Sequence, residues 1–109
     1  MGSPRLQVST KAEDDIRAIG RFIAEQDGLV RAEKVVERIN KAIDALALMP
    51  GIGGPRSYLA SKRRAFPVRP WLIVYLPLKD GIHVLRFIDG RRDLPRLFGK
   101  TKRKPPDNE

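Results

Sequence analysis

The chain has 109 residues, 41% of them hydrophobic, and a net charge of +9 at pH 7, which together indicate one globular domain and exclude a wholly disordered chain. It contains no cysteine and a single histidine, so disulfides, thiolate metal sites, cysteine nucleophiles and multi-histidine metal sites are excluded. No apolar run reaches the ~20 residues that span a bilayer and no signal peptide opens the chain, so we expect a cytoplasmic protein that makes no membrane contact.

The N-terminal part of the chain predicts a short strand followed by a helix. Residues 6–8 alternate in hydrophobicity as a strand does. Thr10 and Glu13 have the spacing of a capping box, which predicts that Thr10 is the N-cap of a helix. Isoleucines then recur at positions 16, 19 and 23, so the helix is amphipathic and runs to about residue 26.

A second helix is predicted directly after a tight turn at Asp27 and Gly28. It covers about residues 29–48, and four residues recur on its apolar face: Val35, Ile39, Ile43 and Leu46. Because the link is so short, the two helices form an antiparallel hairpin whose apolar faces need a common cover.

The second half of the chain predicts three strands, at about residues 64–68, 71–76 and 82–88. Asp80 and Gly81 between the last two are a hairpin signal, because Asp-Gly supplies the positive φ that such a turn needs. Pro67 and Pro70 place the first of these strands at an edge of the sheet or interrupt it.

These elements together predict an α+β fold. An N-terminal strand is followed by the helical hairpin and then by a three-stranded antiparallel meander, with the helices packed on one face of the sheet. We expect a single domain over residues 1–98 and a flexible basic tail over residues 99–109.

The positive charge lies entirely in the second half of the chain. Residues 1–48 carry eight Lys and Arg against eight acids, and residues 49–109 carry fourteen against five. This asymmetry favours an acidic protein or a nucleic acid as a partner.

Arginine and lysine also flank the predicted strands, and these charges can converge on the sheet face away from the helices. The residues concerned are Lys62, Arg63, Arg64, Arg69, Arg86, Arg91 and Arg92. In a strict two-residue period Arg86 shares a face with Ile82, Val84 and Ile88. An arginine among aliphatic residues is either bridged by a carboxylate, for example that of Asp89 or Asp93, or used in binding.

The stretch VLRFIDGRRDL, residues 84–94, resembles the closing motif of the ParE branch of the RelE/ParE toxin superfamily. The helix patterns AEDDIRAIGRFIAE and AEKVVERINKAIDALALMP and the run WLIVY are similar to that family in type and order, and the resemblance covers roughly residues 5–98. It implies the toxin of a type II toxin–antitoxin pair.

ParE toxins inhibit DNA gyrase and block replication, so the resemblance implies that function here, without catalysis and without a cofactor or metal. The implied partner is a ParD-like antitoxin with a ribbon-helix-helix DNA-binding domain. The toxin would contact operator DNA only indirectly, through this antitoxin. Contacts with the target or the antitoxin are expected from seven residues: Trp71, Tyr75, Arg86, Arg91, Arg92, Asp93 and Leu94.

The alternative is the RelE branch, whose members are ribosome-dependent mRNA endoribonucleases. In that case the catalytic cations would be Lys62, Arg63, Arg64 and Arg86. RelE sites often add a C-terminal tyrosine or histidine near the attacking hydroxyl, and this chain has neither after Ile88. The missing acid–base group favours the ParE branch.

Overall fold

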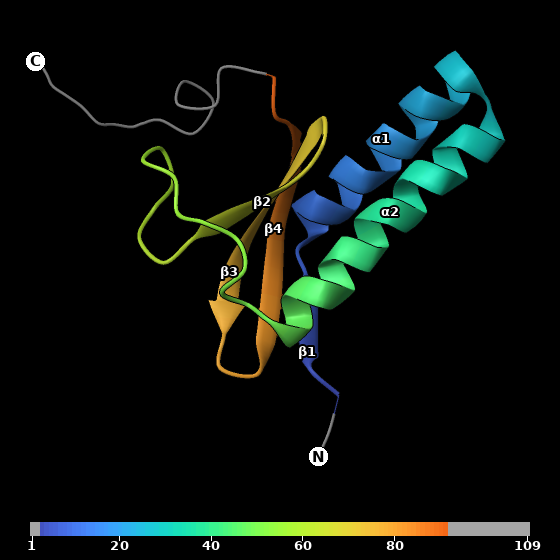
Figure 1. The fold of residues 1–109 in the computed structure, drawn as a ribbon. Helices are drawn as coiled ribbons and strands as arrows, with labels where there is room; N and C mark the ends of the chain where they lie inside the picture. The colour runs from blue at the N-terminus through green and yellow to red at the C-terminus, as the bar shows by residue number, and fades with distance from the viewer. Residues whose placement is uncertain (1–2, 92–109) are drawn as a thin grey trace, which may run out of the picture.

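The computed structural model, which describes residues 3–91, confirms the predicted α+β order (Figure 1). The elements are β1 (Arg5–Val8), α1 (Thr10–Asp27), α2 (Leu29–Leu48), β2 (Arg64–Val68), β3 (Trp71–Leu78) and β4 (Gly81–Asp89). A connector, residues 49–63, joins α2 to β2. The predicted tail at residues 99–109 lies outside the described residues.

The four strands form one sheet in the order β1-β4-β3-β2. The pairs β2–β3 and β3–β4 are antiparallel, as the meander predicts, and β1 pairs with β4 in parallel. The proline-bearing strand β2 is an edge strand, which confirms the inference from Pro67.

The helical hairpin covers one face of the sheet, and the main core lies between them (Figure 1). All four residues predicted on the apolar face of α2 are buried in this core. A smaller cluster lies on the opposite face, where Tyr58 and Leu59 of the connector pack against Ala65, Leu72 and Val74. The connector therefore covers part of the face that the helices leave open.

The start of α1 differs from the prediction by one residue. Ser9 is the N-cap, and its Oγ accepts a hydrogen bond of 2.9 Å from the backbone N–H of Ala12. Thr10 is already the first helical residue, so the predicted capping box of Thr10 and Glu13 is wrong. Ser9 occupies this position because its backbone N–H still bonds to Val84 of β4, which keeps it extended.

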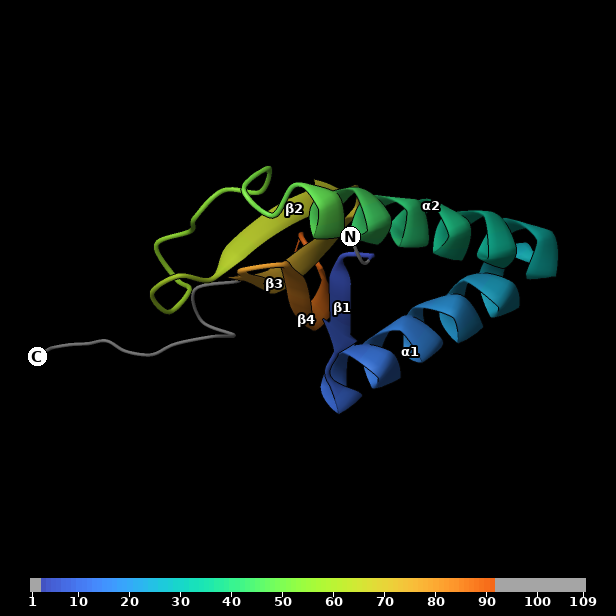
Figure 2. The same ribbon diagram turned by 90° about the horizontal axis from the view of Figure 1, so that it is seen from below.

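Gly28 ends α1 and begins α2, so that the helices meet at a single residue and diverge from there toward the sheet (Figure 2). Its φ of 93° lies in the region that favours glycine. The predicted turn at Asp27 and Gly28 is thereby confirmed.

Gly81, in contrast, is needed for a reason that the sequence did not reveal. Within residues 3–91, Gly28 is the only glycine with a positive φ, so the positive φ predicted at Gly81 is wrong. A Cβ on Gly81 would overlap the carbonyl oxygen of Arg5, because β1 runs directly beside this residue. Glycine here allows two backbones to approach closely.

Candidate functional site

Arg86, the arginine inside β4, is paired with Asp15 of α1. Its Nε donates to Asp15 Oδ2 at 2.7 Å and its Nη2 to Oδ1 at 3.3 Å, and the two side chains are 28% and 14% exposed. The bridge therefore comes from α1, whereas the sequence suggested Asp89 or Asp93. This pairing gives Arg86 a structural role.

Asp15 also completes the edge of β4. Strand β1 pairs with β4 only as far as Val84, so the backbone groups that follow need other partners. Ser9 Oγ donates to the Leu85 carbonyl at 2.9 Å, and Asp15 Oδ2 accepts from the Phe87 N–H at 3.0 Å. Two side chains from the start of α1 thus replace the strand that ends at Val8.

A β-bulge at Leu85 changes the faces predicted for β4. Val74 pairs with Arg86 and Tyr75 pairs with Val84, so Leu85 is an extra residue in the ladder. Ile82 and Val84 lie in the main core, whereas Ile88 lies in the cluster on the opposite face. The prediction that Arg86 shares a face with Ile82 and Val84 is wrong, because one extra residue reverses the alternation.

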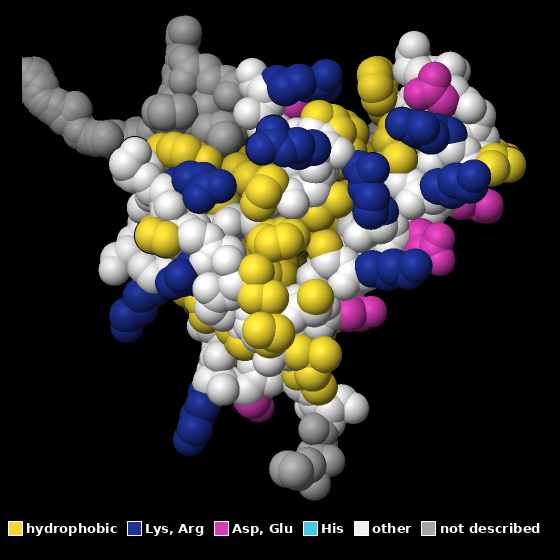
Figure 3. All heavy atoms as spheres, viewed as in Figure 1, with side chains coloured by type: hydrophobic (Ala, Val, Ile, Leu, Met, Phe, Trp, Pro, Cys, Tyr) yellow, Lys and Arg dark blue, Asp and Glu magenta, His cyan; other side chains and the backbone are white. Residues whose placement is uncertain are grey.

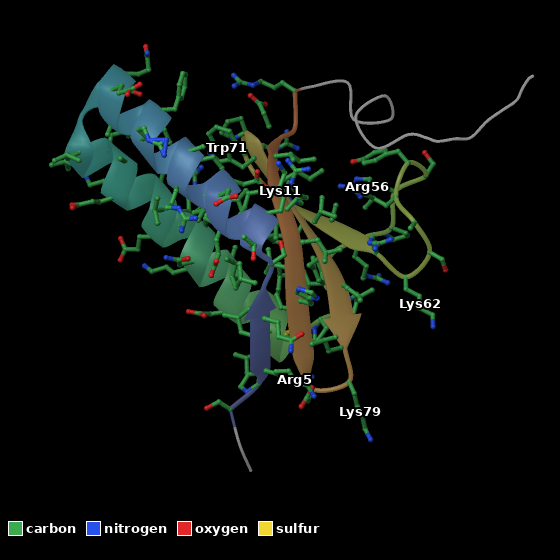
Figure 4. The ribbon with its side chains drawn as sticks, turned by 180° about the vertical axis from the view of Figure 1, so that it is seen from behind. Arg5, Lys11, Arg56, Lys62, Trp71 and Lys79 are labelled. Atoms are coloured by element: carbon green, nitrogen blue, oxygen red, sulfur yellow. The ribbon has the colours of Figure 1, made fainter. Side chains whose placement is uncertain are left out.

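The cations of the nuclease alternative do not converge. They are Lys62, Arg63, Arg64 and Arg86. The first two are exposed on the connector, and Lys62 extends away from the sheet (Figure 4). Arg64 donates to the carbonyls of Gly53 and Gly51. Arg64 and Arg86 also face opposite sides of the sheet, because their β3 partners, Tyr75 and Val74, belong to different core clusters.

Tyr75 is fully buried, although it was predicted to contact a partner. Its hydroxyl donates to the Pro50 carbonyl at 2.7 Å and accepts from the Gly53 N–H at 2.9 Å. Tyr75 therefore anchors the connector to the sheet, and this placement does not fit a direct contact with a partner.

Trp71 and Arg91, two residues predicted to contact a partner, line the same pocket, which has a volume of about 400 Å³. We call it the arginine pocket and define it by three cations and two rings: Arg56, Arg69, Arg91, Tyr58 and Trp71. These residues come from the connector, the β2–β3 turn, the start of β3 and the end of β4; Figure 4 shows Arg56 and Trp71 on their separate segments.

The charges of the arginine pocket are only partly compensated. Arg91 binds Asp89 through Nε at 2.9 Å and Nη2 at 2.7 Å, and these hydrogen bonds raise the pKa of the guanidinium. Arg56 and Arg69 have no carboxylate within 4.0 Å among residues 3–91. A guanidinium free of carboxylates, beside apolar rings, suits a carboxylate or phosphate group on a binding partner.

Two observations indicate that the rings of Tyr58 and Trp71 are partly shielded from water. Burial raises the pKa of Tyr58, and the positive charge of Arg56 and its hydrogen bond oppose this rise. The indole N–H of Trp71 is buried and has no hydrogen-bond partner within the described residues. A buried donor without an acceptor is uncommon in folded proteins and is itself a reason to consider a partner.

Three of the predicted contact residues, Arg92, Asp93 and Leu94, lie outside the described residues. Within residues 3–91 there is no group of acidic residues and histidine that could hold a metal ion. In the same range no helix is both long enough and apolar enough to cross a membrane.

One face of the molecule shows the same mixture of charged and apolar side chains. On the face seen in Figure 3, a band of hydrophobic side chains runs between groups of Lys and Arg. Exposed large hydrophobic residues include Leu48 at 69%, Met49 at 61% and Ile52 at 44%. Such a combination is typical of a surface that binds another protein.

Three residues of these sites were missed by the sequence analysis. Asp15 lies near the start of α1, and no local pattern links it to Arg86, which lies 71 residues further along the chain. Arg56 and Tyr58 lie in a connector without a regular pattern, so only the folded chain brings them to the pocket.

Comparison with known proteins gives three findings. The family model described as ParE toxin of type II toxin-antitoxin system, parDE, matches residues 6–94. Toxin ParE3 of Caulobacter vibrioides is 31% identical over 86 residues, which cover 79% of this chain and 86% of the relative. A structure titled "Chromosomal ParDE TA system from P. aeruginosa" matches with a TM-score of 0.68 at 22% identity, covering 80% of this chain and 96% of that one, which supports the fold.

Proposed function

The chain belongs to the ParE toxin family of type II toxin–antitoxin systems, and on that premise we propose that it inhibits DNA gyrase without catalysis and is neutralised by a ParD-type antitoxin. The observation that carries the proposal is the ion pair of Arg86 with Asp15. The arginine that a nuclease would need at its reacting phosphate is already engaged within the fold.

Two further observations favour a non-enzymatic toxin. The nuclease cations are spread over the connector and both faces of the sheet, so they do not surround one phosphate. The sequence has no tyrosine or histidine after Ile88 that could move a proton. A toxin that acts by binding needs neither feature.

We assign the contact with a partner to the arginine pocket and the end of β4. The pocket combines Arg56 and Arg69, which lack carboxylate partners within residues 3–91, with the rings of Tyr58 and Trp71. Arginine and aromatic residues dominate the binding energy of many protein interfaces. Arg92, Asp93 and Leu94, which follow Arg91 in the sequence, stay predicted contacts that lie outside the described residues.

The antitoxin that fits this chain is acidic and partly disordered, and it folds on the toxin. The net charge of +9 favours such a partner, and ordering on binding lets one segment cover several separate surfaces. In this proposal the antitoxin carries a ribbon-helix-helix domain and alone contacts operator DNA. Toxin and antitoxin would meet in the cytoplasm, where gyrase acts.

Induction of the chain in growing bacteria tests the proposal. Without antitoxin we expect filamentation and a DNA-damage response while protein synthesis continues, because replication is the target. Co-expression of the antitoxin from the neighbouring reading frame should restore growth. Rapid arrest of protein synthesis with cleaved mRNA, and no DNA-damage response, would instead support the ribosome-dependent nuclease.

A further inference from the structure

The arginine pocket is held in shape by hydrogen bonds between the segments that form it. The N–H of Gly90 donates to the carbonyl of Pro70 at 2.8 Å, which joins the end of β4 to the β2–β3 turn. The guanidinium of Arg38, on α2, donates to the carbonyl of Arg69 in the same turn. The turn and the strand end that carry two of the three pocket arginines are therefore fixed without a ligand, as is usual for small-ligand sites.

The pocket has an excess of positive charge. Arg91 is paired with Asp89, whereas Arg56 and Arg69 have no carboxylate within 4.0 Å among residues 3–91. Three guanidiniums against one carboxylate leave two net positive charges around a volume of about 400 Å³. The ligand that neutralises this excess is an anion.

The two rings of the pocket add flat apolar surface beside these charges. Both rings are half-buried and line the pocket with the part that is not covered. A hydrogen bond and the positive charge of Arg56 act on Tyr58, so one pocket cation lies directly beside a ring. Trp71 enters from the start of β3, on a different segment from Arg56 (Figure 4). Cations beside aromatic rings are the combination that binds single-stranded nucleic acids.

This combination fits a nucleotide better than an acidic side chain. Every nucleotide of a strand carries one phosphate charge and one flat base, so a single unit of the ligand uses both a guanidinium and a ring. An aspartate or glutamate side chain uses the guanidinium alone and leaves the rings uncovered. The pocket volume of about 400 Å³ also lies in the range of small-ligand sites.

We propose that the arginine pocket binds one nucleotide of an unpaired DNA strand, an inference that rests on the proposed function, because gyrase holds DNA that it cuts and a cut end offers unpaired nucleotides. The phosphate lies between Arg56 and Arg69, and the base packs against the rings of Tyr58 and Trp71. Duplex DNA, operator DNA included, does not suit this pocket, because its bases are stacked inside the helix and do not reach the rings. The contact breaks no bond in the strand.

The charge distribution of the chain favours the same ligand. Residues 49–109, which include every residue of the pocket, carry fourteen Lys and Arg against five acids. This excess attracts a polyanion before contact is made. Binding to the strand should therefore weaken steeply as the salt concentration rises.

The fluorescence of the chain reports on the pocket directly, because Trp71 is the only tryptophan. A base that stacks on the indole quenches its emission, whereas inorganic phosphate has no ring to stack. A single-stranded oligodeoxynucleotide of about ten nucleotides should quench Trp71 with a Kd of about 1–100 µM at about 0.1 M salt. A duplex of the same length and inorganic phosphate should leave the emission unchanged.

Two double variants of equal charge locate the ligand. Arg56→Gln with Arg69→Gln removes the two pocket cations that lack a carboxylate and should raise Kd for the oligonucleotide at least about tenfold. Lys62→Gln with Arg63→Gln removes the same charge from the exposed connector and should change Kd less than about threefold. Urea denaturation checks that both are folded. Arg69→Gln alone, at an exposed site, should still raise Kd at least about threefold.

Three results would overturn the nucleotide site. The first is an equal Kd for the wild type and the pocket double variant. The second is quenching by the duplex that equals quenching by the single strand. The third is displacement of the oligonucleotide by a polyglutamate peptide of equal charge, which would assign the pocket to an acidic protein segment. An oligoribonucleotide that binds at least about tenfold more tightly would overturn the choice of DNA.

Inhibition of gyrase separates this inference from the proposed function. A chain that inhibits gyrase and does not bind the oligonucleotide at millimolar concentration would overturn the nucleotide site and leave the proposed function standing. A chain that binds the oligonucleotide through the pocket and leaves gyrase unimpaired would refute the proposed function alone. We expect binding and inhibition in the wild type and a loss of both in the pocket double variant.

Discussion

Asp15 and Arg86 lie 71 residues apart in the chain and form the bidentate ion pair that ties α1 to β4. The same carboxylate accepts a hydrogen bond from the backbone N–H of Phe87. A single side chain therefore binds both the guanidinium of Arg86 and a backbone donor at the edge of β4. Arg86, the strand arginine that the nuclease alternative would use in catalysis, therefore has a structural role.

The first prediction concerns the stability that this pair provides. Arg86→Ala should lower the free energy of unfolding by about 1–3 kcal/mol, because the half-buried carboxylate loses its charged donors. Asp15→Ala should cost at least as much, since it leaves both Arg86 and the Phe87 N–H without an acceptor. Urea denaturation of the wild type, the two single variants and the double variant gives the coupling free energy between Arg86 and Asp15.

The toxicity of Arg86→Ala separates the two mechanisms. If the toxin acts by binding, Arg86→Ala should reduce growth inhibition only in proportion to the loss of folded protein. The stability and the growth inhibition should then fall together. A variant that melts like the wild type and yet is not toxic would make Arg86 a catalytic residue and would reverse the assignment.

The second prediction concerns the start of α1. Ser9→Ala should destabilise the chain by about 0.5–2 kcal/mol, because the hydroxyl both caps the helix and donates to the Leu85 carbonyl. Thr10→Ala, one residue further on, is the matched control and should have a smaller effect, because Thr10 is exposed inside the first turn. Equal losses for the two variants would contradict Ser9 as the cap.

The third prediction concerns the pKa of Tyr58, which burial raises and Arg56 lowers. The native pKa of Tyr58 exceeds the unfolded value of about 10. The contribution of Tyr58 to the free energy of unfolding is therefore fully present below pH ~10 and is lost as pH rises through the native pKa. Arg56→Gln should raise the Tyr58 pKa further, since it removes a positive charge. Ultraviolet titration of tyrosinate, with Tyr58→Phe to identify the signal, measures the Tyr58 pKa in both proteins. An unchanged Tyr58 pKa in Arg56→Gln would show that the two side chains do not interact.

The fourth prediction concerns the arginine pocket. Arg69→Ala with Arg91→Ala should leave the free energy of unfolding within about 0.5 kcal/mol per site, because both side chains are exposed. The double variant should nevertheless be less toxic if the pocket touches the target. Lys62→Ala with Arg63→Ala removes the same charge from the connector and should remain toxic. Full toxicity of the pocket variant would move the target contact elsewhere.

The order and the type of all six elements could be predicted from the sequence, because each carries a strong local signal. The apolar spacing of α2 indicated its bounds, and Pro67 indicated that β2 is an edge strand or an interrupted one. The capping serine was missed because its extended backbone is held by a bond to Val84, which no local pattern reveals.

The candidate site was less predictable than the fold, since it depends on contacts between distant segments. The bulge at Leu85 inverts the face of every following residue in β4, and a strict two-residue period cannot anticipate it. The fold brings Trp71 and Arg91, two of the predicted contact residues, to one pocket, and their role in binding stays a prediction. Arg56 and Tyr58 join them through a connector without regular structure.

The most direct test of the central claim is the activity of the purified chain on purified gyrase. We expect loss of supercoiling and accumulation of gyrase-cleaved DNA in proportion to the toxin added, with both effects abolished by the antitoxin. In the same preparation, mRNA on translating ribosomes should remain intact. Unimpaired gyrase together with mRNA cleaved at the ribosome would contradict the account and make the chain a nuclease.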